Sequence, residues 1–83
     1  MRFQLKQYDA EAVVFDTASG DTHYLAPLAL ALFQLCRAFP TTSPDDVRRM
    51  LAQRHALEPG PLLDAQINET LDGLRRIGLI RLE

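Results

Sequence analysis

Three adjacent polar residues, Asp21, Thr22 and His23, are the first candidates for chemistry in this sequence. Carboxylate and imidazole groups form the acid–base part of hydrolytic triads and also bind metal ions. The surrounding residues alternate as in a strand, so Asp21 and His23 share one face and Thr22 points to the other. No serine or cysteine is placed by local geometry as a nucleophile, and two ligands are too few for a tight metal site. We therefore expect no catalytic residue and no metal here, only a polar sheet face after a tight turn that Asp21 caps.

Two further side chains, Cys36 and His55, give no stronger indication of a catalytic or metal-binding site. Cys36 lies in an apolar segment, where a free cysteine is typically a small buried hydrophobe. A reactive thiolate needs a positive, partly exposed site, and the neighbouring Arg37 points about 100° away around a helix. His55 would join Asp21 and His23 only if the fold brought it near, which the sequence does not indicate. We expect no cofactor and no enzymatic activity.

The elements that position these side chains begin with three strands. Residues 2–8 alternate between apolar and polar, residues 12–16 are β-branched and aromatic at their centre, and residues 22–25 follow a Ser-Gly-Asp turn. Gly20 can adopt the positive φ that a tight hairpin needs. The N-terminal part of the chain is therefore predicted to be a three-stranded antiparallel meander.

Three helices are predicted after the strands. The first begins at Pro27 and ends before Pro40, and its apolar residues surround it, which is typical of a buried central helix. The second has Ser43 as its N-cap, and the third covers residues 62–77 with Gly78 at its C′ position. The apolar residues of the third helix recur at helical spacing: Leu63, Ile67, Leu71 and Leu74.

The predicted order of elements gives an α+β fold, winged-helix-like, with three strands before three helices (βββααα) and an extended tail over residues 79–83. We expect one domain over residues 1–83, because 83 residues suffice for a single small core. The net charge of −2 argues against nucleic acid and against an anionic membrane as main partners. The sequence has no signal-peptide pattern and no apolar run of about 18 residues, so we expect a cytoplasmic protein.

Two surfaces of this fold are candidates for binding. The last two helices form a helix-turn-helix, which favours a winged-helix DNA-binding protein, but Asp64, Glu69 and Asp72 would repel phosphates. The third strand, residues 21–25, contains neither proline nor lysine to discourage pairing, so an extended peptide could add beside it as a fourth strand. A structural subunit whose third strand pairs with its own copy is the remaining alternative.

Nearly the whole chain resembles a known family. The stretch VVFDTASGDTHYLAPLALALFQLC, followed by a capped short helix and a helix that ends in LRRIGLIRLE, resembles the PqqD-like family. More narrowly, it is similar to the PqqD-type peptide chaperones found with HPr-kinase-like proteins in bacterial gene clusters. The most specific part is the turn and strand over residues 20–23 that lead into the apolar helix.

The resemblance implies a non-catalytic recognition element for ribosomally made, post-translationally modified peptides (RiPPs). Such a chaperone captures the leader of a precursor peptide and presents it to a separate modifying enzyme, for which an HPr-kinase-like protein is a candidate. The leader pairs with the third strand and lies in a groove against the third helix. Carried onto this sequence, the predicted peptide-binding residues are Asp21, Thr22, His23, Tyr24, Leu25, Ile67, Leu71, Leu74 and Arg75.

Within this set, the residues of the third helix have a second interpretation. Apolar residues at the spacing of Ile67, Leu71 and Leu74 are also typical of a core. Arg75 is expected to be exposed, where it would meet an acidic residue of the leader. The protein would act as a monomer or a homodimer, with neither nucleic acid nor membrane as a partner.

Overall fold

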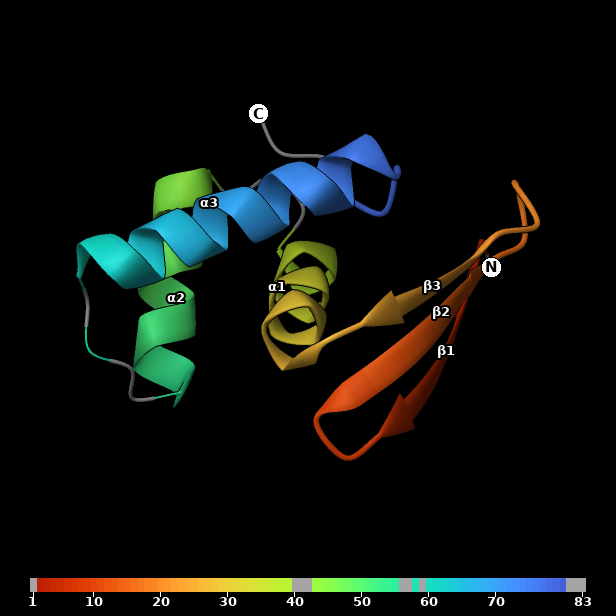
Figure 1. Ribbon diagram of the computed structural model, residues 1–83, viewed down its shortest axis with the longest axis horizontal. Coiled ribbons are helices and arrows are strands. Elements are labelled where there is room, and N and C mark those ends of the chain that lie inside the picture. The colour runs from red at the N-terminus through yellow and green to blue at the C-terminus, as the bar shows by residue number, and fades with distance from the viewer. Residues whose placement is uncertain (1, 40–42, 56–57, 59, 81–83) are drawn as a thin grey trace.

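A computed structural model describes residues 2–39, 43–55, 58 and 60–80. Three strands are followed by three helices (Figure 1). The strands are β1 (Phe3–Tyr8), β2 (Glu11–Asp16) and β3 (Thr22–Leu25), and the helices are α1 (Pro27–Ala38), α2 (Pro44–His55) and α3 (Pro61–Arg76). The predicted α+β arrangement is confirmed. The last part of the predicted tail, residues 81–83, lies outside the described residues.

The three strands form the predicted antiparallel meander, with β2 in the middle. Strands β1 and β2 are joined by a two-residue turn in which Asp9 has a φ of 54°. Residues 17–21 join β2 to β3, and Gly20 there has the predicted positive φ, 80°. In this second turn the N–H of Gly20 donates to the carbonyl oxygen of Asp16 at 2.8 Å.

The carboxylate that caps the β2–β3 turn belongs to Asp16, so the prediction that Asp21 caps it was wrong. Oδ1 of Asp16 accepts the N–H of Ala18 at 2.9 Å, which is the bond of an Asx-turn. Asp16 is the last residue of β2, and its side chain therefore reaches the N–H two positions ahead. Asp21 follows the turn, and its own N–H donates to Oγ of Ser19 at 3.3 Å.

Helix α1 is the centre of the molecule. It buries five residues and packs against the sheet on one side and against α2 and α3 on the other (Figure 1). Ala12, Val14 and Leu25 form the sheet's part of this core. The rings of Phe3 and Phe33 meet edge to face, with centroids 5.8 Å apart. The sheet face toward α1 is called the inner face below, and the opposite face the outer face.

The ends of α2 and α3 follow the predicted signals. The N–H of Asp46 donates to Oγ of the N-cap Ser43 at 3.2 Å. At the end of α3, Gly78 has a φ of 80° and donates to the carbonyl of Arg75 at 3.0 Å. The N–H of Leu79 donates to the carbonyl of Leu74 at 2.9 Å, which completes a Schellman motif. Leu79 is buried, so the motif fixes the end of α3 to the core.

Candidate functional site

The outer edge of β3 is an unfinished ladder in the described part of the chain, where β3 pairs with β2 alone. The N–H of Asp16 donates to the carbonyl of Asp21 at 2.8 Å, so these two residues form a hydrogen-bonded pair. Opposed residues of an antiparallel ladder alternate between bonded and non-bonded pairs. The register pairs Phe15 with Thr22 and Val13 with Tyr24 as the non-bonded pairs. The backbone N–H and C=O groups of Thr22 and Tyr24 therefore point away from the sheet, toward solvent.

Side chains alternate along this edge. Thr22 and Tyr24 lie on the outer face, whereas His23 and Leu25 lie on the inner face, opposite Val14 and Ala12. Leu25 is buried in the core, and Tyr24 is 63% exposed. The hydroxyl of Tyr24 donates to the carboxylate of Glu11, and this hydrogen bond raises the pKa of Tyr24. The ring is thus held toward the first residue of β2, on the outer face of the sheet.

The Asp21–His23 stretch was considered above as a possible acid–base or metal-binding cluster. The register places Asp21 and His23 on one face, as predicted. No group of three or more His, Cys, Asp or Glu residues that could hold a metal ion occurs in the described ranges. His55 lies on α2, where it lines a hollow of about 380 Å³ with Gln7, Ala10 and residues of α1.

Cys36 is a buried hydrophobe, as its apolar surroundings predict. Its side chain belongs to the core cluster, and burial raises the pKa of the thiol, while the nearby charge of Arg75 acts in the opposite direction. A raised pKa keeps the thiol protonated and unreactive at neutral pH.

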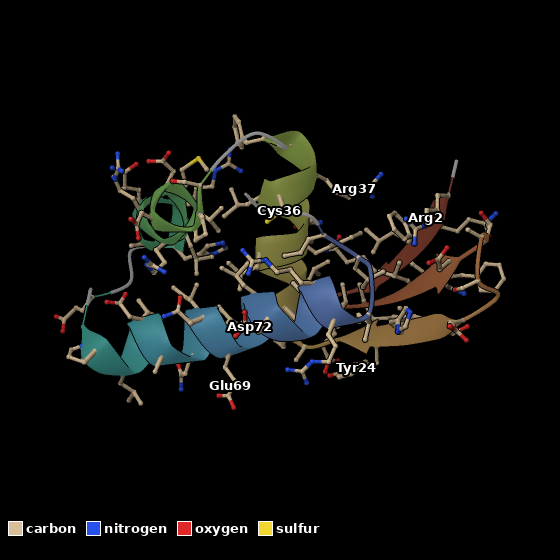
Figure 2. All side chains as sticks on the ribbon, turned by 90° about the horizontal axis from the view of Figure 1, so that it is seen from above. Arg2, Tyr24, Cys36, Arg37, Glu69 and Asp72 are labelled. Atoms are coloured by element: carbon tan, nitrogen blue, oxygen red, sulfur yellow. The ribbon has the colours of Figure 1, made fainter. Side chains whose placement is uncertain are left out.

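Helix α3 lies on the β3 side of the sheet, and β1 is the strand farthest from it (Figures 1 and 2). It packs on α1 and α2. Among described residues, no Cα atom of α3 comes within 8 Å of a Cα atom of any strand. The backbone of α3 therefore stays more than 8 Å, Cα to Cα, from β3.

Of the four α3 residues predicted to contact a peptide, three lie in the core. Ile67, Leu71 and Leu74 have at most 3% of their surface exposed, because they attach α3 to α1 and α2. The side chain of Arg75 is 40% exposed and lies 3.7 Å from Asp72. Arg75 alone among the four offers a surface to a ligand, and a groove contact by α3 stays a prediction.

Sequence reasoning missed the ion pair between Arg2 and Asp16. Nε and Nη2 of Arg2 donate to the two carboxylate oxygens of Asp16 at 3.2 and 3.0 Å. Asp16 is 1% exposed, and the bond from Arg2 is the main reason that its pKa falls from 3.8 to about 2. The signal was available, since an acid that continues the inward alternation of Ala12 and Val14 needs a cation as partner.

Three arginines of α2 and α3 lie beside carboxylates: Arg48, Arg49 and Arg75. Arg48 pairs with Asp45, and its Nη1 also donates to Oδ1 of Asn68 on α3 at 2.6 Å. Arg49 donates to Asp46 at 2.6 Å. The positive charge of these three arginines is thus locally neutralised. None of the helices in the described ranges has both the length and the apolar character needed to cross a membrane.

Comparison with known proteins gives a match of fold. No protein-family model matches the chain, and no curated protein matches it in sequence. Among solved structures, TbiB1 in complex with the TbiA(β) leader peptide matches with a TM-score of 0.72. The match covers 96% of this chain and 90% of TbiB1, at 14% sequence identity. The chain therefore has the fold of TbiB1, a protein solved together with a leader peptide.

Proposed function

We propose that this protein is a non-catalytic chaperone that captures the leader of a ribosomally made precursor peptide and presents it to a separate modifying enzyme. The leader adds to the sheet as a fourth strand, beside residues 21–25. Backbone hydrogen bonds to Thr22 and Tyr24 supply affinity, and side chains that alternate along the leader supply specificity. The modifying enzyme, for which an HPr-kinase-like protein is a candidate, is a different chain.

The observation that carries this proposal is the unfinished ladder of β3 on the side of the sheet where α3 lies. Its outward backbone groups form a template that only another extended backbone completes in full. The likeness to TbiB1 supports the proposal, because the same fold has been seen with a leader peptide. The resemblance of the sequence to PqqD-like proteins supports it independently.

The electrostatics of the helices disfavour the alternative of DNA binding. Three of the arginines on α2 and α3 lie beside carboxylates, and Glu69 and Asp72 are exposed on α3, where they would repel phosphates. Random duplex DNA at low salt is expected not to bind. Binding that weakens steeply as salt rises would favour the winged-helix alternative instead.

An amide-resolved NMR titration tests the proposed function. The ligand is the leader region of a precursor peptide encoded near the gene, and the same residues in scrambled order are the control. Shifts are expected to concentrate over residues 21–25 and on the exposed side of α3 near Arg75. Moderate affinity is expected, because ordering a flexible leader offsets much of the interaction energy. Shifts confined to β1, or equal shifts with the scrambled peptide, would contradict the proposal.

The alternative of a structural subunit, in which β3 pairs with a second copy of the chain, predicts a different result in the same sample. If β3 pairs with its own copy, sedimentation shows a dimer, and the leader competes poorly for the edge. A monomer that binds the leader with one-to-one stoichiometry excludes that alternative.

A further inference from the structure

The outer face of the sheet carries aromatic side chains that no helix of the described chain covers. The register of the strands places four apolar or aromatic residues on this face: Tyr8, Val13, Phe15 and Tyr24. Helix α1 packs on the inner face instead (Figure 1). All three rings of the outer face are exposed, and Tyr24 is the most exposed aromatic residue of the protein. It stands on β3, beside the unfinished ladder.

The ring of Tyr24 is tied to the middle strand. Tyr24 lies directly opposite Val13 on β2, and its hydroxyl donates to Glu11, two residues earlier on that strand. Glu11 is thus a diagonal neighbour, within the reach of a long side chain. The hydrogen bond favours one orientation of the ring on the outer face. A ring that is already oriented loses less side-chain freedom when a ligand packs against it.

A guest strand beside β3 would place one of its side chains next to this ring. Side chains alternate along the guest as they do along β3, so the guest residue next to Tyr24 points to the outer face and the residue next to His23 points to the inner face. Directly opposed Cβ atoms of neighbouring strands lie about 4.5–5.5 Å apart. The guest residue next to Tyr24 would therefore contact its side chain and extend the row that Val13 and Tyr24 begin.

Among the four residues of β3, Tyr24 alone presents a large exposed side chain to a guest. Leu25 is buried in the core, His23 is half-buried on the inner face, and Thr22 is small. Backbone hydrogen bonds to this edge form with any extended sequence, so they do not distinguish one leader from another. Discrimination between guest side chains on the outer face therefore depends on Tyr24.

We propose that Tyr24 is a specificity-determining residue, which selects leaders with an aromatic or β-branched residue at the guest position beside it. Pairs of an aromatic with an aromatic or β-branched residue are among the favourable cross-strand pairs, and such a pair changes affinity by about threefold relative to alanine. The inference rests on the proposed function, because it names the class of leader that the β3 edge accepts. A tyrosine that only stabilised the sheet would affect all leaders equally.

A matrix of affinities tests this selection. Each residue of the leader region used to test the proposed function is changed to alanine in turn, and calorimetry measures binding to the parent and to Tyr24→Ala. One aromatic or β-branched leader position is expected to lose about threefold in affinity against the parent and to lose clearly less against Tyr24→Ala. Tyr24→Thr, a stronger strand former, replaces Tyr24→Ala if the latter does not fold.

The matched control is Tyr8→Ala. Tyr8 is also an exposed tyrosine of the outer face, but it lies on β1, where Nζ of Lys6 is 5.6 Å from its ring centroid. Tyr8→Ala should show the same pattern of losses along the leader as the parent.

Tyrosine fluorescence gives a second measurement, since the chain has two tyrosines and no tryptophan. Tyr8→Phe leaves Tyr24 as the only emitter, and the added leader has its own tyrosine and tryptophan residues changed to phenylalanine. The emission of Tyr24 is expected to change as the leader is added, with the affinity that calorimetry gives. In Tyr24→Phe only Tyr8 emits, and its emission should stay constant.

The outcomes separate this inference from the proposed function. If the leader binds at residues 21–25 and no leader position couples to Tyr24, or one couples equally to Tyr8, the selection by Tyr24 is refuted and the proposed function stands. If the leader does not bind, or binds away from residues 21–25, both are refuted. Coupling of one leader position to Tyr24 and not to Tyr8 supports both.

Discussion

The two edges of the sheet have the same backbone chemistry and different surroundings. The N–H of Thr17 donates to the carbonyl of Arg2 at 2.7 Å, and the same alternation along β1 turns Leu5 and Gln7 outward. In the described chain, β1 thus presents unpaired backbone groups on one side of the sheet just as β3 presents Thr22 and Tyr24 on the other. An unfinished ladder by itself therefore does not mark a binding site.

Protection and position distinguish the two edges. Strand β1 carries Lys6, a residue type that discourages edge-to-edge pairing, whereas β3 carries neither lysine nor proline. Strand β3 also lies on the side of α3, and β1 lies farthest from that helix (Figure 1). A helix on the same side as an unprotected strand, and not the free edge alone, therefore makes β3 the candidate peptide-binding edge.

The largest effect is expected from proline at the β3 edge. Thr22→Pro removes an outward N–H and should abolish leader binding, because proline cannot donate to a ladder. Thr22→Val keeps that N–H and the branched shape, so it should bind as the parent does. Leu5→Pro removes an outward N–H from β1 and should leave binding nearly intact. Calorimetric titration of the three folded variants checks this, and equal affinity in Thr22→Pro and the parent would move the site elsewhere.

Acid is expected to weaken the ion pair of Arg2 and Asp16, which joins the residue before β1 to the end of β2. The pKa of Asp16 is lowered to about 2, first by the hydrogen bond from Arg2, so the ionised form stabilises the folded state. That contribution is complete above about pH 4 and is lost as the pH falls toward about 2. The thermal midpoint of the parent should therefore fall more steeply over this interval than that of Asp16→Asn. Parallel curves would show that the pair contributes nothing.

The two turns of the sheet should differ in how much stability they lose when the residue at positive φ is changed. Gly20→Ala forces alanine to a φ of 80°, with open space around it, and should cost about 1 kcal/mol in the free energy of unfolding. Asp9→Gly relieves a positive φ of 54° in the other turn, so it should cost no more than about 0.5 kcal/mol. Chemical denaturation measures both. A larger loss for Asp9→Gly than for Gly20→Ala would reverse the ranking of the two turns.

The smallest effect is expected from the charge on β1. Lys6→Thr removes the residue that discourages pairing, so sedimentation at high protein concentration should show slightly stronger self-association than the parent. Leader affinity should not change. Self-association that rises while leader affinity falls would place the leader at β1.

Sequence patterns predicted the elements well because their signals are local. Period-two alternation marked the strands, Gly20 and Gly78 marked sites of positive φ, and Ser43 marked a helix start. The candidate site depended on contacts between distant residues, which local patterns do not specify. Helical spacing marked Ile67, Leu71 and Leu74 as apolar, but only the packing of α3 on α1 and α2 showed them to be buried.

The ion pair of Arg2 and Asp16 was not predicted from the sequence for a related reason. Both residues are charged, and strand alternation alone leaves open whether a charge at a strand end meets water or a partner. The pairing arises because the antiparallel register places Phe3 beside Asp16, which brings the preceding Arg2 to the same corner. The alternation of β2 nevertheless indicates an inward position for Asp16, because Ala12 and Val14 are its inward residues.

Amide hydrogen exchange with and without the leader peptide tests the central claim most directly. If the leader adds as a fourth strand, the amides of Thr22 and Tyr24 become protected when it is added, because each then donates a hydrogen bond to the leader backbone. The amides of Leu5 and Gln7 on the opposite edge should exchange as fast as before. Protection at Leu5 and Gln7, or binding without any protection at Thr22 and Tyr24, would contradict the account.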